Sequence, residues 1–223
     1  MTLALTVFQG RVGDHNDRGF GGAAAIGEWQ RWLGLTAATV GTPEARLNTG
    51  WRAELTAATP TLGEMSHRYD AIYSAGQTPV SALTRCAVAL ATLPVVARYH
   101  PDAFVVWFDA HGDLNTPEST TTDYLGGLAL SGPVGMWQSG LGSGDRPVYF
   151  HLDCDVLEPG LVPTDYRVPN GLSLDELSGV ASRLAENAVV GVEVAEFEGS
   201  WSDTGARGDP GPLLTALSPL VGG

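Results

Sequence analysis

The chain is poor in basic residues and contains no long apolar run. Its 12 Lys and Arg residues stand against 25 Asp and Glu residues, which gives a formal net charge of -13. This excess of acid argues against a protein that binds nucleic acid or anionic membranes. No apolar run approaches the ~20 residues that a membrane helix needs, and the first residues lack the basic region of a signal peptide. We therefore expect neither a nucleic-acid partner nor a membrane partner.

Cysteine is also scarce, with Cys86 and Cys154 as the only two. Two cysteines do not make a disulfide framework, and their scarcity is typical of a reducing compartment. We expect a cytoplasmic protein. Cys154 lies inside an apolar-acidic strand pattern, where a small buried thiol is favoured over a nucleophile.

The pattern of apolar segments predicts one domain over residues 1–223 with alternating strands and helices. The apolar runs are continuous rather than alternating, which indicates strands of a parallel sheet covered on both faces. The fold class that follows is α/β, with a mostly parallel, doubly wound sheet. Strands are predicted at 3–8, 34–40, 70–75, 103–108, 147–152 and 188–194, and helices at 21–33, 44–58, 79–97, 124–138, 173–186 and 210–221.

Two helix starts have local signals. Ser173 and Glu176 have the spacing of a capping box, which places a helix start at Ser173. Pro79 is predicted to lie in a first helical turn, where its missing N–H has no cost.

Ionisable residues alternate at the ends of two predicted strands. Asp109, His111 and Asp113 follow the strand at 103–108, and Asp153 and Asp155 follow the strand at 147–152. Residues two apart in an extended segment point the same way, and ligands of open α/β sheets bind at the carboxyl ends of the strands. Crowded carboxylates repel one another unless a cation lies between them. The sequence therefore predicts a pair of divalent metal ions.

Carboxylate and imidazole ligands favour Mn²⁺, with Zn²⁺, Fe²⁺ and Co²⁺ as alternatives. Two ions ~3.5–4 Å apart could share a water and present hydroxide to an electrophilic carbon, so hydrolysis is the expected reaction class. The alternative is that these acidic residues are helix caps or turn residues. That alternative suits one acidic pair better than two pairs, one of which encloses a histidine.

Three segments resemble the arginase, agmatinase and formiminoglutamase superfamily. The segment "DAHGDLNTPESTTTDYLGG" resembles its DAHxD block, and "HLDCDVLEPG" resembles its SxDxDxxDP block, with Glu158 where Asp is usual. The segment "VGVEVAEFEG" resembles a third block, in which Glu193 and Glu196 take the places of a D-x-x-E pair. The blocks occur in the family's order.

The resemblance implies a three-layer α/β/α fold and a homo-oligomer with two Mn²⁺ ions per site, which hydrolyses a guanidino, amidino or formimino C–N bond by metal-bound hydroxide. Carried over by block, Asp109 and Asp153 would bridge the metals, Asp113 would bind the first, and His111 and Asp155 would bind the second. The expected catalytic residues are Glu196, Asp109 and Asp153, and the expected substrate-binding residues are Asn115, Asp123, Glu193 and Glu196, with Glu196 receiving a cationic guanidinium.

The sequence also departs from the family pattern. The histidine of the family's GGDHS block, a ligand of the first metal, is matched to Thr78 in "YSAGQTPVS", so the first metal site is expected to be weak or empty. The family's proton-shuttling histidine falls near Gly126. Asp123 would repel an α-carboxylate, which favours a substrate without one. The alternative function is a degenerate member that binds a ligand or partner without catalysis.

Overall fold

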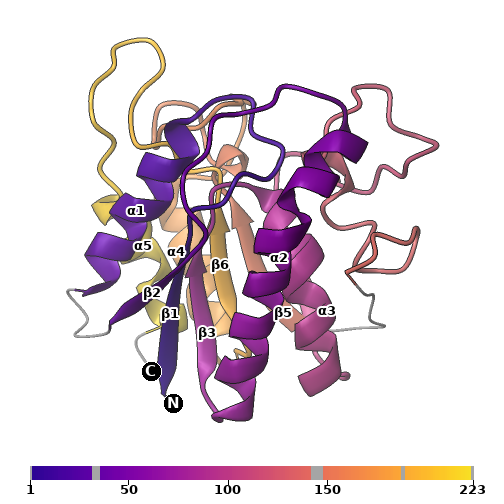
Figure 1. Ribbon diagram of the computed structural model, residues 1–223. Coiled ribbons are helices and arrows are strands. Elements are labelled where there is room, and N and C mark those ends of the chain that lie inside the picture. Colours follow the sequence, from indigo (N-terminus) through magenta and orange to yellow (C-terminus); the bar gives the residue numbers. More distant parts are fainter. Residues whose placement is uncertain (1, 32–35, 142–147, 187–188, 222–223) are drawn as a thin grey trace.

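The chain folds around a six-stranded sheet in which every strand pair is parallel. The computed structural model describes residues 2–31, 36–141, 148–186 and 189–221. The strand order is β2-β1-β3-β6-β5-β4 (Figure 1). The strands are β1 (Leu3–Phe8), β2 (Ala37–Val40), β3 (Thr78–Ala82), β4 (Phe104–Phe108), β5 (Val148–Asp153) and β6 (Val192–Ala195). The predicted parallel, doubly wound sheet is confirmed.

Helices cover both faces of the sheet, which gives three layers (Figure 1). The helices are α1 (Arg18–Arg31), α2 (Trp51–Ser74), α3 (Ala89–Tyr99), α4 (Leu174–Leu184) and α5 (Gly211–Val221). One buried core includes Leu62 of α2 and Leu90 of α3, and the other includes Ile26 of α1 and Leu177 of α4. The three-layer α/β/α fold is therefore confirmed. None of the helices within the described residues is long and apolar enough to cross a membrane.

The structure corrects the prediction around residues 70–97. The segment 70–75 is not a strand, because α2 continues through Pro60 to Ser74. Tyr69, Ile72 and Tyr73 are buried at the i, i+3 and i+4 spacing of one helix face, so the apolar run belongs to a helix. The third strand in sequence is β3 instead, and Pro79 lies within it rather than in a helix.

Other predicted helices and strands agree with the structure only in part. The helix predicted at 124–138 is absent from that described segment, apart from the short 3-10 turn η2 (Gly126–Leu128). This segment contains four glycines and Pro133, all of which disfavour a helix. The strand predicted at 188–194 begins only at Val192. Residues 34, 35, 147 and 188 of the predicted strands and 32–33 of the first predicted helix lie outside the described residues.

The start of α4 agrees with the sequence. The Ser173 side chain accepts a hydrogen bond from Glu176 N, and the Glu176 side chain accepts one from Ser173 N, so the predicted capping box is confirmed.

The parallel arrangement brings the segments that follow β1, β3, β4, β5 and β6 to one edge of the sheet. In the register of the strands, Phe108 pairs with Leu152 and Asp153 pairs with Ala195. The acidic residues after β4, β5 and β6 are thus neighbours in space although they are far apart in the sequence.

Candidate active site

Asp109, His111 and Asp155 form one cluster at this edge, with ligand atoms within 4.8 Å of one another. His111 Nδ1 lies 3.0 Å from Asp155 Oδ2 and 3.4 Å from Asp109 Oδ1. The structure thus brings together residues that the sequence placed on two strands. The reason differs from the predicted one, because β4 ends at Phe108 and the residues that follow are not in a strand.

Two further acidic residues have unusual backbone conformations. Asp113 has φ 47° and Glu196 has φ 61°, in the left-handed region that non-glycine residues rarely adopt. Asp113 is 9% exposed and Glu196 is 6% exposed. Such strain persists where the surrounding structure demands it, and it gathers at functional sites. The Asp113 side chain lies close enough to Asp109 for the charge of Asp109 to raise the pKa of Asp113.

Cys86, rather than Thr78, lies in the acidic site. Cys86 follows the carboxyl end of β3, and its thiol donates to Asp153 Oδ2 at 3.0 Å. Cys86, Asp153 and Glu196 form a second group of possible metal ligands. Thr78 is the first residue of β3 and therefore lies at the opposite edge of the sheet. The sequence match to Thr78 was wrong because the strand was placed at 70–75.

Beneath the acidic cluster lies a buried polar network. His151 Nε2 is 3.0 Å from Cys86 Sγ, and His151 Nδ1 is 2.7 Å from Glu193 Oε1. The His151 ring stacks on Trp107 with ring centroids 3.6 Å apart. Glu193 also accepts hydrogen bonds from Thr92 and Tyr149. Its side chain is fully buried, so the expectation that Glu193 binds substrate is corrected: it holds His151 in place.

The carboxyl groups of the cluster are hard to ionise together. Burial, followed by the charge of Asp109, raises the pKa of Asp113 to about 9. Burial also raises the pKa of Asp153 well above its usual value, with Glu196 and Asp109 adding to the effect. The pKa of Asp155 is raised by burial and by Asp109. A divalent cation would remove this penalty, because it favours the charged carboxylates.

The oxygen atoms present also fit a metal ion. Asp155 Oδ2 is buried and accepts no hydrogen bond from the described residues, although His111 Nδ1 is near it. A buried carboxylate oxygen without a donor is unusual, and a cation bound beside it would satisfy it. The residues whose ligand atoms are grouped closely enough to hold a metal are Cys86, Asp109, His111, His151, Asp153, Asp155 and Glu196. Asp113 lies beside Asp109 and lines the same cavity.

Arg85 was missed by sequence reasoning and lies against Glu196. Its NH1 donates to Glu196 Oε2 at 2.6 Å, and its Nε donates to Asp14 Oδ1 at 3.1 Å. Burial alone would lower the pKa of Arg85, but the neighbouring Glu196, Tyr124 and Asp14 outweigh it and raise the pKa. Correct placement of β3 would have revealed both Arg85 and Cys86, because polar residues after a buried strand lie at the ligand-binding edge.

A cavity of about 420 Å³ opens onto these groups. Asn115 lines it, and Gly126 lines it without offering a side chain for proton transfer. Asp123 does not line it and faces a neighbouring cavity of about 310 Å³ beside Gly50. The argument that Asp123 repels an α-carboxylate is therefore corrected. The polar lining consists of His15, Cys86, His111, Asp113, Asn115, Thr122, Tyr124, Asp153, Asp155, Tyr166 and Glu196.

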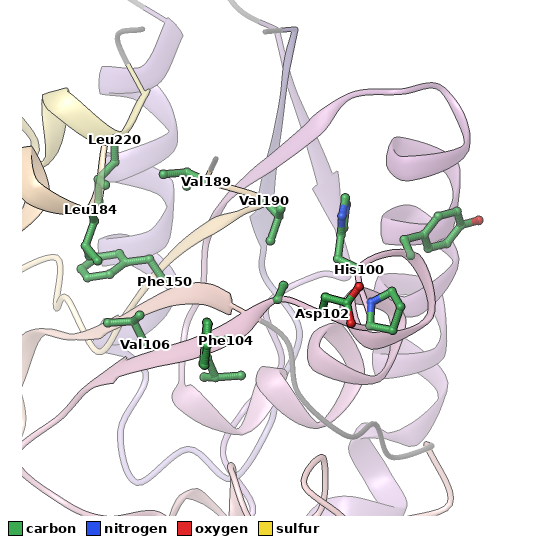
Figure 2. Close-up of a pocket in the computed structure, with 13 residues that line it drawn as sticks. His100, Asp102, Phe104, Val106, Phe150, Leu184, Val189, Val190 and Leu220 are labelled. Carbon is green, nitrogen blue, oxygen red and sulfur yellow. The ribbon is translucent and has the colours of Figure 1, made fainter. Parts of the chain in front are cut away.

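A larger cavity of about 810 Å³ lies elsewhere and carries little chemistry. Figure 2 shows Phe104, Val106 and Phe150 together with Leu184, Val189, Val190 and Leu220 around it, and His100 and Asp102 to one side. Among the described residues it contains none of the groups that could hold a metal. The smaller acidic cavity is therefore the candidate active site.

Comparison with known proteins agrees with this choice. The model of the arginase family matches residues 29–137 and 129–206. The chain is 33% identical to an N(omega)-hydroxy-L-arginine amidinohydrolase of Streptomyces lavendulae over 263 residues, which cover 97% of this chain and 96% of that protein. Because the aligned span exceeds the 223 residues of the chain, that relative contains internal sequence that this chain lacks.

Solved arginases share the fold. The arginase from Bacillus cereus matches with a TM-score of 0.82 at 20% identity, over 98% of this chain and 97% of that one. The arginase from Bacillus subtilis matches with a TM-score of 0.80 at 17% identity, over 100% of this chain and 99% of that one. The family model, the amidinohydrolase relative and the fold agree with one another. The chain belongs to the arginase family, whose enzymes hydrolyse non-peptide C–N bonds.

Proposed function

We propose that the protein hydrolyses the C–N bond of a guanidino or amidino group in a small linear substrate that enters the 420 Å³ cavity. The observation that carries this proposal is the convergence of buried Asp113, Asp153, Asp155 and Glu196 on one cavity. Membership of the arginase family supports the reaction class. Glu196 would accept N–H donors from the substrate, as a carboxylate at the cavity wall can do.

The proposed cofactor is a pair of divalent metal ions, with Mn²⁺ as the expected metal. Asp109, His111 and Asp155 would hold one ion, and Asp113, Asp153 and Cys86 would contribute to the other. When bound, such ions supply a Lewis acid that lowers the pKa of water. Because Cys86 contributes sulfur, Zn²⁺ and Co²⁺ compete better here than at a site made of oxygen and nitrogen alone.

The protein's own residues would position the substrate and move protons. Asn115 offers an amide to the far end of the substrate, while Glu196 holds the amidine end. His15 lines the same cavity, and its ring centroid lies 4.3 Å from that of Tyr124. An imidazole can both accept and donate a proton, so the His15 side chain is the proposed carrier of the proton to the leaving amine.

Two observations, the name of one relative and the position of Asp123, support a narrower substrate class. The S. lavendulae relative is named for N(omega)-hydroxy-L-arginine, which carries both a modified guanidine and an α-carboxylate. Since Asp123 faces the neighbouring cavity, it does not oppose such a carboxylate. We infer a guanidino or N-hydroxyguanidino amino acid, or a close analogue, as the substrate.

The test is a hydrolysis screen with metal-loaded protein. L-arginine, agmatine, N-hydroxy-L-arginine and formiminoglutamate are incubated with the Mn²⁺-loaded enzyme, and urea, hydroxyurea, ammonia and formamide are measured. We expect turnover of at least one guanidino compound and a loss of at least 100-fold in Asp153→Asn, since Asp153 belongs to one group of possible metal ligands and lines the cavity. Asp203→Asn, at an exposed acidic residue, is the matched control and keeps its rate.

A second candidate function is ligand binding without catalysis, and one observation favours it. Arg85 already engages Glu196, which leaves the carboxylate less free to receive a substrate. Protein that remains inert with every compound after Mn²⁺ addition would support this alternative and contradict the hydrolase proposal.

A further inference from the structure

Arg85 places a guanidinium of the protein itself against the residue proposed to bind the guanidine of the substrate. All three of its guanidinium nitrogens are engaged. NH1 donates to Glu196 Oε2 at 2.6 Å, NH2 donates to Asn16 O at 3.0 Å, and Nε donates to Asp14 Oδ1 at 3.1 Å. The side chain is 1% exposed, so the group is fixed in place.

Both oxygens of Glu196 are held by consecutive residues. While Oε2 accepts from Arg85, Oε1 accepts from Cys86 N at 3.2 Å. Glu196 lines the cavity, whereas Arg85 does not. A ligand in the cavity therefore meets a carboxylate that already carries a protein cation.

The charge of the ligand then decides how well it binds. A second guanidinium on Glu196 would lie close to the guanidinium of Arg85, and like charges repel strongly where water is excluded. A neutral amidine-type group can donate its N–H groups to the same carboxylate without this repulsion. A hydroxyl on a guanidine nitrogen withdraws electrons and makes the group much less basic, so an N-hydroxyguanidine gives up its proton near neutral pH at a small cost in free energy, whereas a guanidinium does not.

We propose that Arg85 determines the substrate specificity of this site by acting through Glu196, and that it selects weakly basic amidine-type groups, such as N-hydroxyguanidines, over permanently charged guanidinium groups. Arg85 is thus a positioning residue rather than a catalytic one. This role rests on the proposed function, because it requires the amidine end of the ligand to reach Glu196.

The test compares three ligands with the same alkyl chain. Binding of butylguanidine, butyl-N-hydroxyguanidine and butyl-N-methoxyguanidine to the Mn²⁺-loaded protein is measured by titration calorimetry. We expect the wild-type protein to bind both oxygen-substituted ligands at least tenfold more tightly than butylguanidine. The methoxy ligand separates neutrality from a direct contact between a hydroxyl group and the metal.

Variants at Arg85 test whether the charge of Arg85 causes the preference among the ligands. Arg85→Gln removes the cation and should reduce the preference at least tenfold, whereas Arg85→Lys keeps the charge and should retain it. Arg98→Gln is the control, since Arg98 forms an exposed ion pair with Asp70 and does not line the cavity. Circular dichroism checks the folding of each variant. If Arg85→Gln does not fold, the affinities of wild type and of Arg85→Lys for the three ligands still test the specificity role.

Equal affinity of the wild-type protein for charged and neutral ligands would overturn the specificity role. An equal loss of affinity for all three ligands in both Arg85 variants would also overturn the specificity role, because such a loss would indicate that Arg85 is only structural. Hydrolysis is measured on the same preparations. If the protein shows the binding preference but no hydrolysis, the proposed hydrolase function is wrong and the specificity role of Arg85 stands. If it hydrolyses a guanidino compound but shows no preference, the specificity role is wrong and the hydrolase function stands.

Discussion

Asp113 combines burial, a left-handed backbone and a pKa raised to about 9, first by burial and then by Asp109. Between its ordinary pKa near 3.8 and about 9, the folded metal-free protein holds a proton on Asp113 that the unfolded chain releases. The free energy of unfolding of the metal-free protein therefore falls as pH rises through this window.

Asp113→Asn tests this dependence, because asparagine has the same shape and also tolerates positive φ. At pH 8 and without metal, we expect the variant to be more stable than wild type by about 1–3 kcal/mol, because folded wild type must hold a proton on Asp113 that its unfolded chain releases, whereas asparagine needs none. Thermal unfolding at pH 5 and pH 8 is the measurement. A metal-free wild-type protein that gains stability toward pH 8 relative to the variant would contradict the account.

Cys86 and Cys154 form a natural pair of probe and control. Both are buried, but only Cys86 belongs to the groups of possible metal ligands, and Cys154 packs in the second core. With Co²⁺ bound, a thiolate ligand gives a charge-transfer absorption band in the near ultraviolet. We expect this band in wild type and in Cys154→Ser, and its loss in Cys86→Ser. A band that survives in Cys86→Ser would show that the sulfur does not bind the metal.

The acidic part of the site could be predicted from the sequence, and the part after β3 could not. Asp109, His111, Asp153 and Asp155 follow strands whose apolar runs are unmistakable, so their convergence needed only the rule for parallel sheets. Cys86 follows a strand, "TPVSA", that contains proline and two hydroxyl residues. The strand β3 is buried because it lies in the middle of the sheet between β1 and β6. The hydrophobicity of the segment itself does not predict this position.

At the scale of elements, α1 packs directly against the chain that follows Glu196. A Cβ atom at Gly22 would overlap the backbone of Phe197, whereas a Cβ atom at the adjacent Gly21 would lie 3.5 Å from Gly199 Cα, an ordinary contact. The missing side chain at Gly22 therefore lets α1 approach the segment that holds Glu196 in its left-handed conformation.

The two glycines make a matched pair of variants. Gly22→Ala forces this segment to move, and we expect it to destabilise the protein by about 1–3 kcal/mol, as overpacking does, and to lower hydrolysis at least tenfold. Gly21→Ala should be neutral or stabilising by up to about 1 kcal/mol, because alanine favours the helix. Urea unfolding and the hydrolysis assay measure both effects. Equal behaviour of the two variants would refute the role assigned to this contact.

The predictability of elements followed their local signals. β1, β4, β5 and α4 were predicted well, because their apolar runs or caps stand out from the flanking sequence. The segment 70–75 failed, because a short apolar run fits a buried helix face as well as a strand. The long helix α2 shows that the helix is the right choice for this segment. The length of α2 depends on its packing against α3 and the sheet, which the short apolar run does not reveal.

At the scale of the whole molecule, the net charge of -13 is partly concentrated in one place. The described carboxylates of Asp109, Asp113, Asp153, Asp155 and Glu196 gather at one edge of the sheet, opposite the start of β3. The fold class was predictable, since alternation of strands and helices persists through the chain. The larger apolar cavity was not, because it forms where side chains from segments far apart in the sequence meet.

We propose that the acidic cluster at the carboxyl edge of the sheet holds the catalytic metal. The most direct measurement is an anomalous difference map from crystals soaked in Mn²⁺, recorded on both sides of the manganese absorption edge. We expect density among Asp109, His111, Asp153 and Asp155 in the wild-type protein, and no density there in Asp153→Asn crystals. Active protein whose crystals show no density at this cluster, or show it only elsewhere, would contradict a metal site at this edge of the sheet.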